Sequence, residues 1–190
     1  MPNWCENSAI FEHEDPTMID RVCQGFQSGG LFAEFMPCPA ELHEHSAPMR
    51  DDKLADTFLE KYGARDWYDW QLKNWGCKWD VESNGDGIQR LSPNTVKVYF
   101  DSPWSPPIEG YKSLCAMDFV IEALYNEPGM AYCGKFTGAR GGVRDDYMDY
   151  GSETAETVRN EIGEELDDFF GISENMADME EWEKEENSNE

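Results

Sequence analysis

The sequence predicts an α+β fold of the ferredoxin-like class, in which two helices pack on one face of a four-stranded antiparallel sheet. Strand-like and helix-like hydrophobic patterns follow one another in the order β-α-(insertion)-β-β-α-β, which is the ferredoxin-like order. The chain has 190 residues, of which 39% are hydrophobic and 13% aromatic, and this is enough apolar material for a core. We therefore expect a folded protein rather than a disordered one.

The first strand and the first helix have clear signals. Residues 4–11 alternate imperfectly with a period of two, which predicts a strand with both faces partly covered. Asp15 and Pro16 then supply a helix cap and a first-turn proline, and Gly29-Gly30 supplies a stop. Between these signals, apolar residues recur with helical spacing at Ile19, Val22, Cys23 and Phe26.

Residues 37–75 form a predicted insertion between the first helix and the next strands. Just before it, residues 31–36 have the pattern of a short strand, which ends at the run Pro37-Cys38-Pro39. Residues 40–53 are a polar loop. Two helical patterns follow, carried by Leu54, Phe58 and Tyr62 and by Trp67, Trp70, Gln71 and Trp75.

A hairpin, a helix and a strand complete the predicted domain. Residues 77–82 and 96–101 both alternate between apolar and polar side chains, and residues 83–87 have the composition of a turn, which together predict a hairpin. After the prolines at 103, 106 and 107 we expect a helix, and then a strand that contains Tyr132 and Phe136. The apolar positions of that helix are Leu114, Met117, Ile121 and Leu124.

The negative charge is concentrated near the C-terminus. Residues 1–144 carry 22 acidic and 13 basic side chains, a net charge of -9, whereas residues 145–190 carry 18 acidic and 2 basic side chains, a net charge of -16. We therefore divide the chain into a ferredoxin-like domain over residues 1–138, a glycine-rich connector over 139–150, and an acidic helical segment with a tail over 151–190.

The acidic segment has a helical pattern of its own. Ser152 is a suitable cap for a helix, and Gly171 ends it. An apolar stripe within this helix comprises Val158, Ile162, Leu166 and Phe169, and a weaker stripe beyond Gly171 comprises Ile172, Met176, Met179 and Trp182.

Charge and motifs exclude several classes of function. A formal charge of -25 and a pI near 4.2 argue against direct binding of nucleic acid, which needs clustered Lys and Arg. Lys97 and Tyr99 are a poor substitute for the missing aromatic signature of RNA-recognition modules. The chain has no run of eighteen apolar residues and no signal-peptide pattern at its start, so we expect a cytoplasmic protein without a membrane partner.

Catalytic and metal-binding patterns are weak. The six cysteines form no CxxC pair, and we interpret them as reduced structural thiols. His43 and His45 have the spacing of metal ligands, but an isolated HxH in a polar loop is more typical of an ordinary loop. Residues 80–86 imitate half of a calcium loop, but Leu91 stands where the closing Glu is required. We expect no enzyme activity, no cofactor and no metal.

Four segments of the chain carry distinctive motifs. They are Met1-Pro2-Asn3-Trp4-Cys5-Glu6-Asn7, Phe35-Met36-Pro37-Cys38-Pro39-Ala40-Glu41-Leu42, Asn74-Trp75-Gly76-Cys77-Lys78-Trp79-Asp80 and Phe100-Asp101-Ser102-Pro103-Trp104-Ser105-Pro106-Pro107. Together they resemble the YubB-like ferredoxin-domain proteins of phages and conjugative plasmids. The resemblance spans residues 1 to about 138 and leaves the acidic segment outside it. It implies a ferredoxin-like fold and an origin in a mobile element, but no activity. Cys77 and Ser102-Pro103 depart from the Thr and Thr-Ala expected there.

The charge distribution suggests the first functional hypothesis, a non-enzymatic protein that binds a host protein through an acidic surface. The partner is expected to have a basic groove for nucleic acid, because such a groove already accepts rows of negative charge. For a protein of a mobile element, inhibition of a host defence nuclease by DNA mimicry fits this role. Equally, the segment fits a solvated helix with a disordered tail. The expected contact residues are Glu161, Glu164, Glu165, Asp167, Asp168, Asp178, Glu180 and Glu181.

Two alternatives remain open. In the first, a structural or assembly module binds a protein partner through an aromatic patch of Trp75, Lys78, Trp79 and Trp104, which could also be ordinary core tryptophans. In the second, the chain is a small metal-dependent enzyme. The oligomeric state is left open by the sequence.

Overall fold

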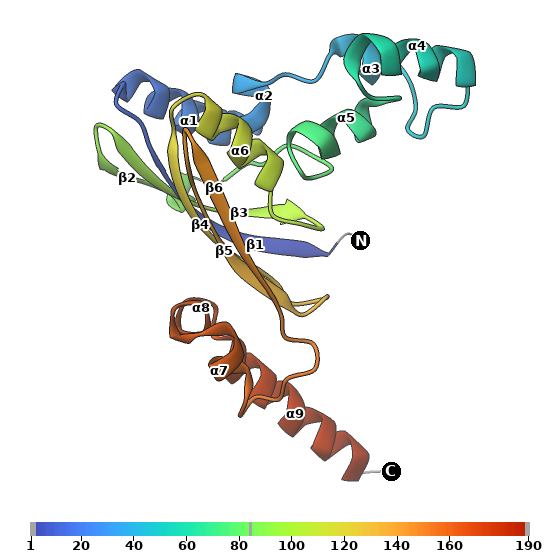
Figure 1. The fold of residues 1–190 in the computed structure, drawn as a ribbon. Helices are drawn as coiled ribbons and strands as arrows, with labels where there is room; N and C mark the ends of the chain where they lie inside the picture. Colours follow the sequence, from blue (N-terminus) through green and yellow to red (C-terminus); the bar gives the residue numbers. More distant parts are fainter. Residues whose placement is uncertain (1–2, 84, 189–190) are drawn as a thin grey trace.

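A six-stranded antiparallel sheet forms the centre of the structure, a computed structural model that describes residues 3–83 and 85–188 (Figure 1). The strand order is β2-β3-β1-β4-β5-β6, so β1 lies between β3 and β4 inside the sheet. The strands are β1 (Trp4–Glu12), β2 (Ile88–Ser92), β3 (Thr95–Pro103), β4 (Val120–Glu127), β5 (Tyr132–Ala139) and β6 (Gly142–Asp149).

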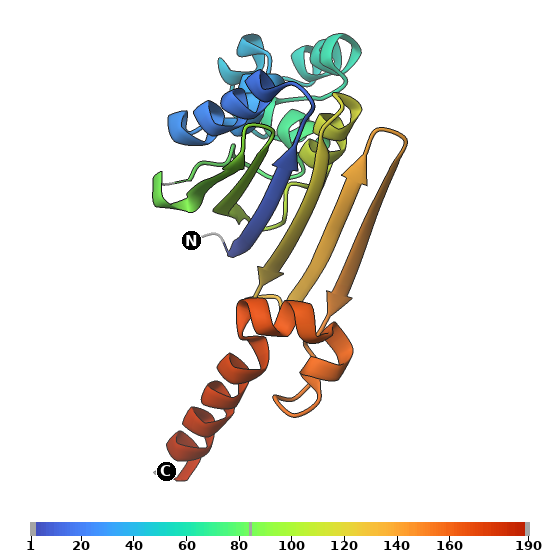
Figure 2. The ribbon, with the colours of Figure 1, turned by 90° about the vertical axis from the view of Figure 1, so that its left-hand side faces the viewer.

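Helices α1 (Pro16–Ser28) and α6 (Ile108–Ala116) cover one face of this sheet (Figure 2). The sequence signals of α1 are confirmed, because the Asp15 carboxylate accepts the Thr17 amide at the N-terminus and Gly29 adopts a φ of 79° at the C-terminus. Side chains alternate along a strand, so every second residue of β3 points into the core beneath these helices. Val96 and Val98 are among them, with Phe26 of α1 and Leu114 of α6 on the opposite side of the same cluster.

The two helices predicted in the insertion are confirmed, but the polar loop predicted over residues 40–53 contains a further short helix. After α2 (Leu31–Phe35), the insertion contains α3 (Ala40–His43), α4 (Asp52–Tyr62) and α5 (Trp67–Asn74). These helices lie beside α6 and extend away from the sheet (Figure 1). Trp70 and Trp75 join the insertion to the main core, where their rings meet edge to face at a centroid separation of 5.8 Å.

Two predicted strands on either side of the insertion are wrong. Residues 31–35 form helix α2, because the Asp80 carboxylate accepts the amides of Phe32 and Ala33 at its start. Residues 77–82 form no strand, since the Val81 carbonyl accepts the Leu31 amide and turns this segment toward α2 instead of the sheet. The hairpin instead uses β2, and Pro93-Asn94 is its turn.

The helix predicted after the prolines at 103, 106 and 107 is too long. It ends at Ala116, and Asp118 adopts a left-handed φ of 70° before β4 begins. Ile121 and Leu124 have a spacing that also fits a helix, but in β4 they point to opposite faces of the sheet. Their hydrophobicity therefore serves two separate clusters.

The predicted connector over residues 139–150 is part of the sheet. β5 and β6 form a hairpin in which Ala139 faces Gly142, and Gly141 in the turn has a φ of 106°. The glycines here make a tight turn, as the positive φ requires, rather than a flexible joint.

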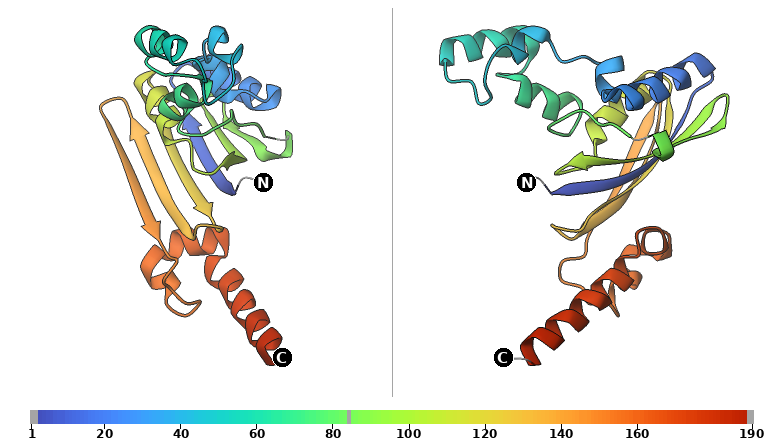
Figure 3. Two further views of the ribbon diagram at one scale, coloured as in Figure 1. Left: turned by 90° about the vertical axis from the view of Figure 1, so that its right-hand side faces the viewer. Right: turned by 180° about the vertical axis from the view of Figure 1, so that it is seen from behind.

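Three helices follow β6 and pack on the face of the sheet opposite α1 and α6 (Figures 2 and 3). They are α7 (Val158–Ile162), α8 (Glu164–Phe170) and α9 (Ile172–Ser188). The single helix predicted from Ser152 is divided, because Gly163 leaves the helical conformation at φ 84° and ψ 160°, and the cap position of α7 is Thr157. The predicted stop at Gly171 is confirmed, with a left-handed φ of 63°.

A second, smaller core holds these helices in place. Cys133 of β5 and Tyr150 after β6 contribute from the sheet side, and the Tyr150 hydroxyl donates to the Asn126 side chain at 2.8 Å. The helices contribute Val158, Ile162, Leu166 and Ile172. Within the described ranges, no helix is both long and apolar enough to span a membrane.

Candidate partner-binding surfaces

The carboxylates predicted to bind a partner divide into exposed and internally bonded groups. Glu161 of α7, Glu164 of α8, and Asp178 and Glu181 of α9 are all exposed. These four lie on the helices that stand on the far face of the sheet, away from the main core.

Asp167 is wrongly predicted as a contact residue, since its side chain is buried with a relative exposure of 3%. Its carboxylate accepts the Ser173 amide at 2.7 Å, the Ser173 hydroxyl at 2.8 Å and the Arg159 guanidinium at 2.7 Å. Burial by itself would raise the pKa of Asp167, but these hydrogen bonds outweigh it and lower the pKa below its ordinary value. Asp167 therefore joins α7, α8 and the start of α9.

Three other predicted carboxylates have partners inside the chain but remain accessible. Glu165 pairs with Lys135 of β5 at 2.7 Å, and Asp168 pairs with Arg159 at 2.6 Å. Glu180 accepts the Ala155 amide at 2.9 Å, which ties α9 to the segment before α7. Surface pairs of this kind contribute little net free energy, so these carboxylates could exchange their internal partners for those of another protein.

Helix α9 carries an acidic stripe, which we define as Glu174, Asp178 and Glu181. The three residues follow one another at i, i+4 and i+7, which places them on one face of the helix, and all three are exposed. At 1.5 Å rise per residue their spacing along the axis is about 6 and about 4.5 Å. Glu174 was not among the predicted contact residues, although the same helical spacing in the sequence would have identified it.

The apolar residues of α9 differ in exposure. Ile172 and Met176 pack against the second core, on the side of the helix opposite the acidic stripe. Met179 and Trp182 lie beyond the edge of that core and are 64% and 63% exposed. The weaker apolar stripe predicted from the sequence is therefore half buried and half presented to solvent, where α9 extends past the sheet (Figure 3).

The predicted aromatic patch is not one surface. Trp75 is buried in the main core, where its indole Nε1 donates to the Met36 carbonyl at 3.1 Å and its ring stacks on Phe32. Trp79 and Trp104 are exposed, and the Lys78 ammonium lies 4.5 Å from the centre of the Trp79 ring.

The two sequence segments that supply these tryptophans do meet. The Ser105 hydroxyl donates to the Gly76 carbonyl at 2.8 Å, and the Gly110 amide donates to the Trp75 carbonyl at 3.0 Å. The contact joins the loop after β3 and the start of α6 to the end of the insertion. It does not arise from neighbouring strands, since residues 77–82 form none.

The two histidines of the insertion take part in aromatic contacts. His43 stacks on Trp67 with an interplanar angle of 15°, and His45 lies against Phe58. In the part of the chain that the structure describes, no three His, Cys, Asp or Glu side chains are grouped closely enough to hold a metal ion. Both histidines therefore pack against aromatic side chains of the insertion itself.

Comparisons with known proteins identify the family. A search of curated proteins finds no match. Among solved structures, the crystal structure of a protein Api92 from Yersinia pseudotuberculosis is similar, with 13% sequence identity and a TM-score of 0.47 over 80% of this chain and 99% of the other. The family model described as the ferredoxin-like domain in Api92-like proteins matches residues 74–174.

The family match extends beyond the strands of the sheet. It runs from the end of the insertion, through β2 to β6, to the first residues of α9, and thus includes α7 and α8. Because the matched region covers more than half of the chain and contains most strands of the sheet, this chain belongs to the family of Api92-like proteins with a ferredoxin-like domain.

Proposed function

We propose that this chain is a non-enzymatic protein of phage or plasmid origin that binds a host protein through helix α9. The partner has a basic surface that ordinarily binds nucleic acid, and the chain inhibits it by occupying that surface, as an anti-defence protein would. The observation that carries the proposal is the acidic stripe of Glu174, Asp178 and Glu181 on a helix that extends past the sheet.

Charge geometry supports this partner class. The stripe repeats a negative charge every 4.5 to 6 Å or so along α9, which is on the order of the spacing between phosphates on one strand of a duplex. Only two basic residues stand among the last 46 residues against 18 acidic ones, so the field around α9 is strongly negative. Such a field accelerates association with a basic partner and repels nucleic acid itself.

Met179 and Trp182 support a protein partner in particular. A large exposed aromatic side chain beside charged residues is typical of the anchors that dominate protein–protein interfaces. Trp182 lies between the acidic stripe and Met179 around the helix, so one partner surface can contact all of them. A chain that used charge only for solubility would not need these two apolar side chains in solvent.

The finer fold assignment belongs to the same proposal. We take β1, α1, β2, β3, α6 and β4 as the ferredoxin-like unit, and β5, β6 and helices α7 to α9 as additions to it. In this interpretation the added strands provide the platform that carries α9. The resemblance to YubB-like proteins of mobile elements supports the phage or plasmid origin.

The experiment is a capture of host proteins by the immobilised full chain, with identification by mass spectrometry. The expected result is enrichment of nucleic-acid-binding proteins at low salt and their release at about 0.5 M salt, because added ions screen the pairing of α9 with a basic groove. Competing duplex DNA is expected to release the same proteins. The triple variant Glu174→Gln, Asp178→Asn, Glu181→Gln and the single variant Trp182→Ala are each expected to lose them.

A control with the same change in net charge separates a shaped surface from bulk charge. Glu14, Glu44 and Glu60 are exposed carboxylates outside the C-terminal helices, and their triple change to Gln is expected to leave capture intact. Equal loss in both triple variants would contradict the proposal. Removal of residues 177–190 is a further test that leaves the second core in place, whereas truncation after Tyr150 would also remove Val158 and Leu166 from it.

An alternative function is that of an assembly module which binds a protein partner through Trp104. The Trp104 side chain is half exposed, and its backbone amide donates to the Asn3 carbonyl at 2.9 Å, which fixes it beside the start of β1. If Trp104→Ala abolishes capture while the α9 variants retain it, the aromatic surface rather than the acidic stripe binds the partner.

A further inference from the structure

A groove of about 920 Å³ lies where β3 extends beyond β2. β2 pairs with β3 only over Thr95 to Val98, while β3 continues to Pro103 in pairing with β1. Tyr99 and Asp101 of β3 line the groove beyond the end of β2. Its remaining lining comes from Trp4, Gly29, Trp79, Asp80, Glu82, Ser83, Asp86, Gly87, Phe100 and Pro103.

The charge of the groove is entirely negative. Of the lining residues that the structure describes, none is basic and four are acidic. The Asp80 carboxylate already has hydrogen-bond partners inside the chain, since it accepts the amides of Phe32, Ala33 and Val81. Glu82, Asp86 and Asp101 remain to face an occupant.

Asp101 is a partly buried carboxylate of the groove. Partial burial raises the pKa of its side chain, which means that the local environment disfavours its negative charge. A cation placed in the groove would reverse that effect and favour the ionised form. A cationic occupant would therefore be stabilised by the ionised Asp101.

Two exposed tryptophans form the aromatic part of the groove. Trp4 and Trp79 are 48% and 42% exposed, and both contribute to the lining together with Tyr99. The Trp79 ring already attracts a cation, because the Lys78 ammonium, which does not line the groove, lies 4.5 Å from its centre. Aromatic faces next to carboxylates are the surroundings in which guanidinium groups bind, by stacking and by paired hydrogen bonds.

We propose that this groove binds an arginine side chain of an extended basic peptide segment in a partner protein. Arginine suits it better than lysine because a planar guanidinium can stack on Trp79 and contact a carboxylate in the same pose. A peptide suits it better than a free amino acid because the groove continues into a second hollow of about 240 Å³. The two share Tyr99, Phe100 and Asp101, and the lining of the second includes Phe169 and Phe170 of α8.

The site is separate from the acidic stripe of α9 and stands without it. None of Glu174, Asp178 and Glu181 lines the groove or the second hollow. The two surfaces can serve one basic partner, but each has its own residues and its own test.

The test is a titration of the full chain with the capped peptide Gly-Arg-Gly-Arg-Gly, followed through the indole signals of its tryptophans in NMR spectra. The expected result is saturable binding with shifts at Trp4 and Trp79. A peptide with citrulline in place of arginine, which keeps the shape and lacks the charge, is expected not to bind. Arginine amide alone is expected to bind at least about fivefold more weakly than the peptide, because it reaches only part of the groove.

Variants locate the binding. Asp101→Asn and Trp79→Ala are each expected to weaken it by about fivefold to tenfold. Trp104→Ala, an exposed tryptophan outside the groove, and the triple α9 variant are expected to change it less than twofold. Asp101→Asn preserves the shape of the side chain, so it remains informative if Trp79→Ala fails to fold.

Each other outcome overturns the proposal in a recognisable way. Unchanged binding in Asp101→Asn removes the groove as the site. If only the triple α9 variant loses peptide binding, the peptide binds the acidic stripe and not the groove. That outcome would be compatible with the proposed function. Equal affinity for arginine amide and for the peptide would replace the peptide segment by a small-molecule ligand, and equal affinity for the citrulline peptide would remove the role of charge.

Discussion

The ring of Phe169 lies parallel to the ring of Tyr99, with an interplanar angle of 3° and a centroid separation of 6.3 Å. The Lys97 ammonium lies 4.9 Å from the centre of the Tyr99 ring and 5.3 Å from that of Phe169. Tyr99 points away from the face of β3 that α1 and α6 cover, because its neighbours Val98 and Phe100 point into that core. This contact therefore fastens the acidic helices to the far face of the ferredoxin-like sheet.

The Phe169 contact predicts that α8 loosens when its ring is removed. We expect Phe169→Ala to lower the free energy of unfolding by about 1 kcal/mol, which is the usual contribution of one partly exposed aromatic pair. Hydrogen exchange in α8 should accelerate more than exchange in α1. Met179→Ala removes an exposed side chain of α9 and serves as the control, with little expected change. Equal exchange rates in wild type and Phe169→Ala would show that the stacking does not hold the helix.

The buried carboxylate of Asp167 predicts a large loss of stability on truncation. Asp167→Ala leaves the Ser173 amide and the Arg159 guanidinium without their shared acceptor, so we expect a loss of about 2 to 3 kcal/mol in chemical denaturation at pH 7. The neighbouring Asp168→Asn, at an exposed carboxylate, is expected to cost less than about 1 kcal/mol. A similar loss in both variants would contradict the structural role of Asp167.

The lowered pKa of Asp167 predicts how its contribution changes with pH. Hydrogen bonds from Ser173 and Arg159 favour the ionised form in the folded state against the opposing effect of burial, so the folded-state pKa lies below the ordinary value near 3.9. The stabilisation is then complete above about pH 4 to 5 and disappears as the pH falls through the lowered pKa. The difference in unfolding free energy between wild type and Asp167→Asn, measured from pH 7 to pH 3, should shrink toward the acidic end. A difference that stays constant would contradict this linkage.

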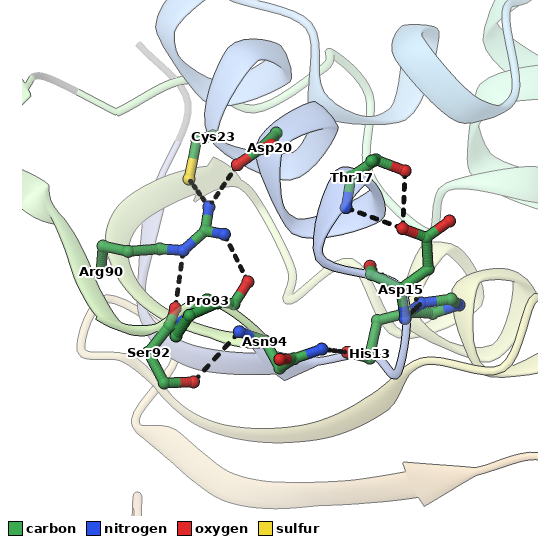
Figure 4. Close-up of polar contacts among 9 residues, drawn as sticks. All are labelled: His13, Asp15, Thr17, Asp20, Cys23, Arg90, Ser92, Pro93 and Asn94. Atoms are coloured by element: carbon green, nitrogen blue, oxygen red, sulfur yellow. Dashed lines mark hydrogen bonds and ion pairs between the residues drawn. The ribbon is translucent and has the colours of Figure 1, made fainter.

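A set of hydrogen bonds, which we call the clasp, joins the turn of the β2–β3 hairpin to the loop between β1 and α1 (Figure 4). The Asn94 side-chain amide donates to the His13 carbonyl at 2.8 Å and to the Glu14 carbonyl at 2.7 Å, while the His13 amide donates to the Asn94 carbonyl at 3.1 Å. Arg90 adds an ion pair to Asp20 of α1 at 2.8 Å.

This clasp predicts the effect of Asn94→Ala, which loses both side-chain hydrogen bonds. We expect the midpoint of thermal unfolding to fall, with a loss of about 1 to 2 kcal/mol in stability. Gln89→Ala, at an exposed position of the same hairpin, should leave the midpoint close to that of wild type. If the two variants unfold alike, the clasp contributes nothing measurable.

The burial of the cysteines predicts the order in which they react with a thiol reagent such as DTNB. Cys23 and Cys38 are partly exposed, and the other four cysteines are buried. Burial raises the pKa of Cys38 to about 11, so at pH 8 it carries little thiolate and should react slowly. Burial also raises the pKa of Cys115 to about 11 and that of Cys133 to about 12, and it raises the pKa values of Cys5 and Cys77 further.

Titration of the native chain should therefore count two slow or moderate thiols, and titration in denaturant should count six. Cys38→Ser should reduce the native count by one and leave the reaction of Cys23 unchanged. Rapid reaction of more than two thiols in the native chain would contradict the described packing of β1 and β5.

Much of the ferredoxin-like domain could be predicted because its signals are local. The Asp15 cap and the Gly29 stop define α1 within a few residues, and the alternation in residues 4–11 and 96–100 marks β1 and β3. Helices α4 and α5 of the insertion are also where their apolar spacing placed them, whereas α3 lies in a segment predicted to be a loop. In each confirmed case the residues that form the element are also the residues that carry the pattern.

The failed predictions share one physical cause. Residues 77–82 alternate as a strand should, but the hydrogen bond from Leu31 to Val81 and the bonds to Asp80 give their polar groups partners outside the sheet. Ile121 and Leu124 have helical spacing only because the two faces of β4 lie in two different cores. The conformation of such segments depends on residues that are distant in the sequence, and a local sequence pattern contains no information about those residues.

The candidate surfaces, like the fold, could be predicted only in part. The excess of carboxylates after residue 145 is visible in the sequence, and so is the helical repeat of Glu174, Asp178 and Glu181. The removal of Asp167 and Trp75 from the surface was not visible, because burial depends on contacts with Ser173, Arg159 and Phe32 that form only in the fold.

The sequence by itself therefore determined composition, charge, the start and end of α1, the positions of α4 and α5, and the class of fold. The tertiary structure decided which residues are exposed: it buried Trp75, placed Phe169 on Tyr99, and opened the groove between Trp79 and Asp101 where β3 extends beyond β2. The reason is that propensity and capping act over a few neighbouring residues, whereas burial and surface shape arise from packing between segments far apart in the chain.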